Sequence, residues 1–356
     1  MADITSSDST ATLAKRTDLT IPTPYLVFIG DIQNPTDAKT GFGLVEWRRD
    51  WCAAQWRLAG CPVDLGLPEL APEAARAAGV RTLVIGVAPA GGRLPVHWMP
   101  AMREALRAGL NLAAGLHDRL AGYPELVETA RASGARLFDA RQAPPGLVLP
   151  VGSGARRSGR RVLTVGTDCA IGKKYTALAL ERELRARGVA ADFRATGQTG
   201  VLISGGGLAI DAVVSDFVAG TVEMLSPAAD PGHWDVIEGQ GSLFHPAYAG
   251  VSLGLLHGAQ ADAIVLCHDT RRHCIDGYDD FPMPSVEECI ALNLQLGALT
   301  QPAIQCVGIS LNTQGMSSAQ RQQACADLSE RTGLPVTDPI AMGVQPIVDR
   351  LLQRCT

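Results

Sequence analysis

The most constraining feature of this sequence is a glycine-rich loop between an apolar run and a helix-forming stretch. The loop GTDCAIGKK, residues 166–174, follows RVLTV, which is typical of a buried strand, and precedes a helical pattern that Gly188 ends. Glycines let backbone amides face a ligand, and a helix N-terminus and Lys173 add positive charge. The alternative is a glycine-rich turn without a ligand. We expect the loop to bind the phosphates of a cofactor through Gly166, Thr167, Asp168, Cys169, Ala170, Ile171, Gly172, Lys173 and Lys174.

The loop departs from the standard phosphate-binding sequence at two points. Five residues separate Gly166 from Gly172 instead of the usual four, and Lys174 stands where Ser or Thr normally offers a hydroxyl to Mg²⁺. An ammonium group cannot ligate a cation. Thr176 lies roughly 200° further around the helix and cannot simply substitute, although Thr167 could offer a hydroxyl from the loop. These differences argue against metal-assisted phosphoryl transfer as the function, but they are compatible with binding of a diphosphate.

The elements around the loop predict an α/β protein with two domains, which suits 356 residues. Strand candidates alternate with helical patterns on both sides of a Pro-, Gly-, Ser- and Arg-rich segment that marks a boundary near residue 150. Loops after parallel strands should share one edge of the sheet, where ligands bind. We expect a flexible tail at 1–20, an N-terminal domain with an open parallel sheet at 21–150, and a P-loop domain with a mostly parallel sheet at 151–356.

Two segments of the first half are predicted to be helical. Trp47 and Trp51 are four residues apart, which places them on one helical face. The stretch MPAMREALRAGLNLAAGL, residues 99–116, has the composition of a helix. The first strand, residues 25–30, is not followed by a GxGxxG sequence, so nucleotide binding by this half is not supported.

Composition excludes several classes of protein. A net charge of −5 argues against a nucleic-acid partner, and no apolar run approaches the roughly 20 residues that span a bilayer. The N-terminus has no apolar signal-peptide core, and nine cysteines without a disulfide framework suit a reducing cytoplasm. Cys267, His268, His273 and Cys274 match no common zinc spacing, so we expect no metal site there.

Two short motifs carry a resemblance to known P-loop proteins. GTDCAIGK resembles the GTDxxxGK loop of the dethiobiotin synthetase group, in which five residues also separate the glycines. WDVIEGQGS, residues 234–242, resembles the strand-end motif of that group, whose acidic residue sits beside the metal and the phosphates. The resemblance implies this role for Glu238, with Asp235 as a weaker candidate earlier in the strand.

The order of motifs over residues 25–350 resembles one bacterial family, long uncharacterised, whose members are assigned as D-glutamate (D-amino-acid) N-acetyltransferases. The matching stretches are GTDCAIGK, ATGQTG, SDFVAG and EGQGSLFHPAYAG. The resemblance implies a Rossmann-like N-terminal domain, a P-loop domain and acetyl-CoA as co-substrate. Coenzyme A carries a diphosphate, which a loop without a magnesium hydroxyl could hold.

The expected site residues follow from this reaction. The attacking amine must be neutral, so a carboxylate or imidazole should take its proton, and the candidates are Glu238, His245 and Asp216. Arginines could pair with the substrate carboxylates. The residues expected to bind or orient the substrate are Arg194, Gln198, Gln240, Ser242 and Arg271, with Arg272 as a further cation.

Two other functions stay open. An ATP-dependent ligase or kinase like dethiobiotin synthetase would use Glu238 and Thr167 to hold Mg²⁺ and Lys173 to neutralise the γ-phosphate. A nucleotide-regulated binding protein would need no catalytic residue. For all three functions we expect a cytoplasmic homo-oligomer. In the two enzymatic functions the protein would act on a small molecule, which for the transferase is an amino acid.

Overall fold

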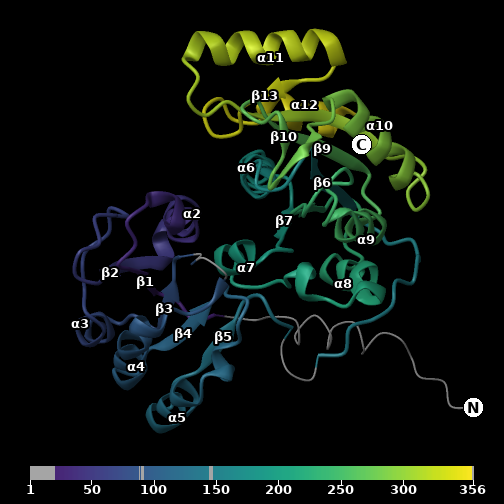
Figure 1. Ribbon diagram of the computed structural model, residues 1–356. Helices are drawn as coiled ribbons and strands as arrows, with labels where there is room; N and C mark the ends of the chain where they lie inside the picture. Colours follow the sequence, from purple (N-terminus) through teal and green to yellow (C-terminus); the bar gives the residue numbers. More distant parts are fainter. Residues whose placement is uncertain (1–20, 88, 90–91, 144–146, 355–356) are drawn as a thin grey trace, which may run out of the picture. The chain divides into compact units, whose positions relative to one another are not determined.

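The computed structural model describes residues 21–87, 89, 92–143 and 147–354, so the expected tail at 1–20 lies outside the described residues. The chain divides into two compact units. The first runs to Leu147 and also includes Gly197–Ala212, and the second comprises Val148–Thr196 and Val213–Thr356. Each unit contains a parallel sheet with helices (Figure 1), which confirms the expected α/β class with mostly parallel sheets.

The first unit has a five-stranded parallel sheet in the order β2-β1-β3-β4-β5. Its strands are β1 (Tyr25–Gly30), β2 (Cys52–Arg57), β3 (Thr82–Ile85), β4 (Asn111–Ala114) and β5 (Leu137–Asp139). Its helices are α2 (Lys39–Trp47), α3 (Pro72–Ala77), α4 (Met99–Arg107), α5 (Pro124–Ser133) and α7 (Gln198–Ser204). All six residues of β1 are buried, as expected for a strand covered on both faces.

Both helical predictions in this unit are partly wrong. Helix α2 ends at Trp47 because Arg48 leaves the helical region at φ −140°, and Trp51 lies in a separate 3-10 turn just before β2. The short Ala-containing run of β2 becomes a strand because it pairs with β1. Helix α4 ends at Arg107, since Gly109 turns the chain at φ +80° into β4.

The second unit has a six-stranded parallel sheet in the order β13-β12-β9-β6-β8-β7. Its strands are β6 (Arg160–Gly166), β7 (Ala191–Arg194), β8 (Trp234–Ile237), β9 (Ala263–Asp269), β12 (Gln305–Asn312) and β13 (Val336–Thr337). A two-stranded antiparallel hairpin, β10 (Cys274–Ile275) and β11 (Tyr278–Pro282), follows β9. The strand before the glycine-rich loop, β6, thus lies near the middle of the sheet.

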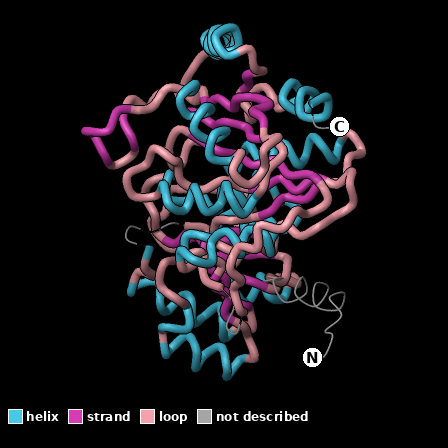
Figure 2. Tube along the Cα trace, turned by 90° about the vertical axis from the view of Figure 1, so that its right-hand side faces the viewer, coloured by secondary structure: helices cyan, strands magenta, loops and turns pink. Residues whose placement is uncertain are grey.

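Helices cover both faces of this sheet (Figures 1 and 2). They are α6 (Lys173–Ala186), α8 (Val218–Leu225), α9 (Ala249–Ala259), α10 (Val286–Gly297), α11 (Ser318–Thr332) and α12 (Gln345–Arg354). Contacts place α6 and α12 on one face and α9 and α10 on the other, with α8 packed on α9 and α11 against the edge strand β13. None of the helices in the described ranges combines the length and apolarity that a bilayer crossing requires.

Candidate functional site

The glycine-rich loop has a conformation that depends on its two glycines. A Cβ atom on Gly166, the last residue of β6, would come within 2.6 Å of the Ile171 side chain. Gly172 caps the N-terminus of α6 at φ +115°, a conformation that side chains disfavour, and Ala170 also has a positive φ of 53°. The loop therefore leads directly from a buried strand into a helix N-terminus, as an anion-binding loop requires.

Lys173 lies at the base of this loop and is only 6% exposed. Its Nζ donates a hydrogen bond to the Asp168 carbonyl oxygen at 2.6 Å. Burial lowers the pKa of Lys173, because desolvation penalises the charged form more than the neighbouring groups favour it. An anion beside this ammonium would therefore be bound strongly.

The Asp168 side chain is held by protein groups and does not point to a ligand as a free carboxylate. Its oxygens accept hydrogen bonds from the backbone N–H of Cys169 at 2.6 Å, from that of Asp276 at 2.9 Å and from Arg272 at 2.5 Å. Asp276 and Arg272 follow β9 and lie at the hairpin. The β9 segment thus fixes the shape of the phosphate-binding loop.

The hydroxyl groups of the loop are hydrogen-bonded within the protein. Thr167 Oγ1 lies 3.0 Å from His268 Nδ1. Thr176 Oγ1 donates to the Gly172 carbonyl and lies 2.7 Å from Ser310 Oγ, on the buried side of α6. The Lys174 ammonium lies over the Tyr175 ring at 4.6 Å from its centroid. These positions leave the loop with cations and amides for a ligand and do not favour magnesium binding.

The end of β8 packs directly beside the loop. A Cβ atom on Gly239 would lie 1.6 Å from the Thr164 carbonyl oxygen and 3.1 Å from the Lys173 side chain, so only glycine allows this approach. Glu238 is 3% exposed, and its Oε2 accepts a hydrogen bond from the Thr196 N–H at 3.1 Å. Glu238 therefore directly precedes Gly239, the residue that packs against the Lys173 side chain.

Two polar residues after Glu238 connect the neighbouring loops. Ser242 Oγ donates to the Thr167 carbonyl at 3.0 Å, and Gln240 Nε2 donates to Thr196 Oγ1 at 3.2 Å. Both side chains position loops at the edge where β6, β7 and β8 end. Their expected role in binding the substrate stays a prediction.

His245 lies against the same loop and is only 2% exposed. One of its ring nitrogens, the Asp168 carboxylate and the Cys169 sulfur lie within 4.8 Å of one another. Its Nδ1 accepts a hydrogen bond from the Ala247 N–H at 3.1 Å, so the neutral imidazole carries its proton on Nε2. Its ring packs on Tyr248 at 4.4 Å between centroids and on Tyr278 at 5.2 Å.

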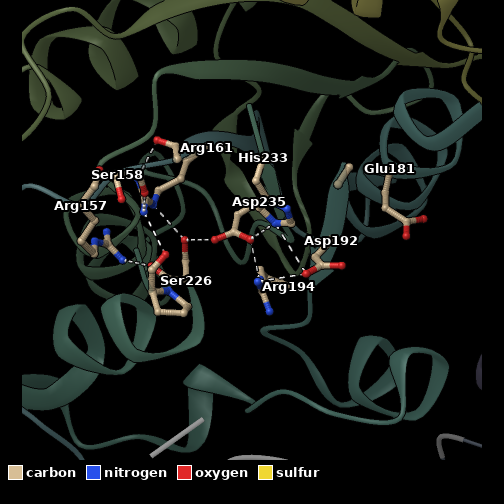
Figure 3. Close-up of polar contacts among 12 residues, drawn as sticks. Arg157, Ser158, Arg161, Glu181, Asp192, Arg194, Ser226, His233 and Asp235 are labelled. Carbon is tan, nitrogen blue, oxygen red and sulfur yellow. Dashed lines mark hydrogen bonds and ion pairs between the residues drawn. The ribbon is translucent and has the colours of Figure 1, made fainter. Parts of the chain in front are cut away.

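Arg194, expected at the substrate, takes part in an ionic network of side chains on and beside β7 and β8 (Figure 3). Its Nε donates to Asp235 at 2.7 Å and its NH2 to Asp192 at 3.2 Å. Asp235 also accepts hydrogen bonds from Ser226 at 2.6 Å and lies 3.2 Å from His233. Arg194 and Asp235 are thus paired with each other, and their expected roles at the substrate and the phosphates stay predictions.

Three other candidates have other surroundings. Arg271 is paired with Asp269 at 2.7 Å, so of the two adjacent arginines Arg272 is the one that contacts the loop. Asp216 is exposed in a 3-10 turn before α8. Gln198 begins α7 in the first unit, where it packs near Gly115.

Sequence reasoning assigned no role at the loop to His268, Asp276 or Tyr278. His268 follows the apolar run of β9 at the edge where the strands end, and that position was the available signal. Asp276 and Tyr278 lie in a hairpin whose fold-back onto the loop depends on the contact between Arg272 and Asp168. Such a contact carries no local sequence pattern.

Two groups of side chains are close enough to hold a metal ion among the residues that the structure describes. They are Asp168, Cys169 and His245, and Asp192, His233 and Asp235. In each group an arginine already compensates the carboxylates, Arg272 in the first and Arg194 in the second. The donor sets therefore fit internal ion pairing better than metal coordination.

Comparisons with known proteins agree with this architecture. A family model described as "Domain of unknown function (DUF1611_C) P-loop domain" matches residues 150–348, and one described as "Domain of unknown function (DUF1611_N) Rossmann-like domain" matches residues 56–143. These descriptions confirm the predicted Rossmann-like and P-loop halves.

Relatives match nearly the whole chain. Proteins from Pseudoalteromonas sp and Tritonibacter scottomollicae, both named D-glutamate N-acetyltransferase, are each 45% identical over 331 residues, which is 93% of this chain and 99% of each relative. The crystal structure of a DUF1611 family protein from Anabaena variabilis is 33% identical, covers 94% of this chain and all of its own, and gives a TM-score of 0.80.

Proposed function

We propose a mechanism from the premise that the chain belongs to the DUF1611 family and, like its relatives named D-glutamate N-acetyltransferase, is an acyltransferase that acetylates the amine of D-glutamate. The observation that carries the proposal is the buried Lys173 at the start of α6, inside a loop whose hydroxyls are hydrogen-bonded to the protein. Such a loop suits a phosphate group that is held without being cleaved.

Acetyl-CoA is the acetyl donor in this proposal. Its diphosphate would lie on the backbone amides between Gly166 and Lys173, at the N-terminus of α6, with the Lys173 ammonium beside it. Eight cysteines in the described part of the chain are free thiols, which supports a reducing cytoplasm as its compartment. The acceptor is a small amino acid.

Acetyl transfer forms a C–N bond and breaks the C–S bond of the thioester. The neutral amine of D-glutamate attacks the thioester carbonyl, its proton passes to a base, and coenzyme A leaves as the thiolate. We assign the base to Glu238, because its buried carboxylate is held by the Thr196 N–H just after β8, beside the loop. Asp216 is exposed to solvent, which makes it the weaker candidate.

His245 has a different role in this mechanism. Because Nδ1 accepts the Ala247 N–H, Nε2 carries the proton and acts as a donor. A donor beside the loop stabilises negative charge on the thioester oxygen as the tetrahedral intermediate forms. Glu238 and His245 therefore divide proton transfer and charge stabilisation between them.

The direct test is release of free coenzyme A thiol from acetyl-CoA in the presence of D-glutamate, with a chelator and without ATP. We expect turnover that magnesium does not increase, and mass spectrometry should identify N-acetyl-glutamate as the product. L-Glutamate and an amine-free diacid serve as controls for the acceptor.

Ligand-dependent melting separates this function from the ATP-dependent alternative, because a ligand that binds the native state raises its melting temperature. Acetyl-CoA should raise Tm without magnesium. A rise with ATP and magnesium only, without thiol release, would contradict the proposed function.

A further inference from the structure

A cavity of about 390 Å³ opens in the second unit beside the phosphate-binding loop. It lies where β9 and β12 end, between the N-terminus of α10 and one face of α11. Its wall is largely apolar, with Met283, Leu311 and Leu328, and carries the cationic side chains of Arg272 and Arg331. Its volume lies at the lower end of the usual range for small-molecule pockets, and it is open to solvent.

Two residues belong to both the cavity and the loop. His268 lines the cavity and lies 3.0 Å from Thr167 Oγ1, and Arg272 lines it and donates to the Asp168 carboxylate at 2.5 Å. Only the side chains of His268 and Arg272 would therefore separate a ligand in the cavity from a diphosphate on the loop. The two positions can belong to one molecule.

The chemistry of the cavity favours a nucleoside over an amino acid. The apolar wall matches a flat heteroaromatic ring, whereas D-glutamate has only two methylene groups to cover. Asp327 lies on the wall, where Oδ1 accepts a hydrogen bond from Gln323 at 2.6 Å and Oδ2 can accept one from the exocyclic amine of adenine. The acid would repel a carboxylate placed at the same point.

Arg331 is the partner available for a further anionic group. The N-terminus of α10 is capped by a reciprocal capping box, in which the N–H groups of Ser285 and Glu288 bond to each other's side chains. Arg331 pairs with Glu287 at 2.7 Å, but both side chains are exposed, and such surface pairs are weak. A phosphate can replace Glu287 as the partner of this arginine.

We propose that this cavity receives the adenosine 3′-phosphate end of acetyl-CoA, with Arg331 bound to the 3′-phosphate. The inference rests on the proposed function, because it requires a coenzyme A ester on the loop. It places the adenosine on the α10 and α11 side of the sheet, with the diphosphate on the loop and the pantetheine directed toward Glu238 and His245.

Filling the cavity is the first test, and α11 offers a matched control. Ala324 lines the cavity, whereas Ala326 is exposed on the same helix. Ala324→Trp should raise the Kd of coenzyme A about tenfold, by calorimetry, and leave the Kd of 4′-phosphopantetheine, which lacks the adenosine, unchanged. Ala326→Trp should leave both constants unchanged.

The 3′-phosphate contact is tested by comparing coenzyme A with dephospho-coenzyme A. Arg331→Ala should weaken coenzyme A roughly tenfold and leave dephospho-coenzyme A unaffected, because only the former carries the phosphate. Glu287→Gln should act in the opposite direction and tighten coenzyme A alone. Both are surface changes, so the folded protein remains available, and melting curves verify this for each variant.

Three outcomes would overturn the proposal. One is an unchanged Kd of coenzyme A in Ala324→Trp, and another is equal weakening of both coenzymes in Arg331→Ala. A raised KM for D-glutamate in Ala324→Trp with normal coenzyme binding would assign the cavity to the acceptor instead. Failure of the proposed function looks different, since the wild-type protein would then neither bind coenzyme A nor release its thiol.

Discussion

Among single residues, Lys173 is the one that should make the affinity for a phosphate ligand depend on pH. Its ammonium is buried and bonded to one backbone carbonyl, and desolvation lowers its pKa. A bound diphosphate favours the protonated form and so raises this pKa. Between the lower pKa of the free protein and the higher pKa of the complex, binding takes up a proton, and affinity falls as pH rises through the free pKa.

We therefore expect coenzyme A binding at alkaline pH to be accompanied by proton uptake, measured by calorimetry in buffers of different ionisation enthalpy. Lys173→Met should abolish this uptake and weaken binding by about 1.5–3 kcal/mol, the contribution of a charged hydrogen bond. Lys174→Met is the control, since Lys174 lies over Tyr175 and should contribute less. Undiminished uptake in Lys173→Met would assign the proton to another group.

His245 is the residue whose tautomer decides its chemistry. If its Nε2–H stabilises the oxyanion, His245→Ala should lower kcat by about 10²–10³-fold, as loss of one such donor does elsewhere. His245→Gln should recover part of this loss, because its amide can donate from a similar position. Equal loss in both variants, together with a missing acidic limb in the pH profile of kcat, would show that His245 is the base.

Among the elements, the ionic network on and beside β7 and β8 ties three segments of the second unit together (Figure 3). Asp235 on β8 is almost fully buried and joins Arg194 at the end of β7 to Ser226 after α8. Ser226 in turn accepts a hydrogen bond from the buried Arg161 of β6 at 2.9 Å. The network therefore holds three adjacent strands in register and stabilises the ends that carry Glu238.

Asp235→Ala should lower the free energy of unfolding by about 3–5 kcal/mol, because it removes the buried negative charge that faces Arg194 and Arg161 and leaves the Ser226 hydroxyl without its acceptor. Asp192→Ala is the matched control. Its side chain is 43% exposed and also pairs with Arg194, so its loss should cost only about 0–1 kcal/mol. Similar denaturation midpoints for the two variants would mean that burial does not determine the contribution of this network.

Elements with a strong local pattern could be predicted from the sequence, and those shaped by distant contacts could not. The apolar runs of β1 and β6 and the glycine at the start of α6 are local signals, and the structure agrees with them. Strand β2 has a short run whose identity comes from pairing with β1. Trp47 and Trp51, which precede it, have helical spacing but lie in α2 and in a separate 3-10 turn.

In the candidate site, too, local sequence patterns predict some residues, whereas distant contacts decide the others. Glu238 and His245 come near the loop because they follow β8, a strand parallel to β6, and parallel strands end at one edge. The choice among Arg194, Arg271 and Arg272 depends on which carboxylate each one meets. These carboxylates approach only in the folded chain, so residue type and order could not decide between them.

On the scale of the whole molecule, the first unit depends on a segment inserted between two parts of the second. Residues Gly197–Ala212 cluster with the first unit although about 50 positions separate them from Leu147. Helix α7 buries Leu202 completely, its Thr199 lies 3.2 Å from Thr40 of α2, and Asp211 pairs with Arg141. The N-terminal sequence alone therefore lacks part of its own core.

Leu202→Ala should destabilise the first unit by about 2–5 kcal/mol, the usual cost of emptying a buried leucine site. Tryptophan fluorescence during denaturation reports this unit, since four of the five tryptophans lie in it and only Trp234 lies in the second. Leu299→Ala, at a site in the second unit that is 71% exposed, is the control and should leave the midpoint unchanged. An unshifted fluorescence midpoint in Leu202→Ala would show that α7 adds little to the first unit. A shift confined to the fluorescence signal would show that the two units unfold separately, although the chain passes between them more than once.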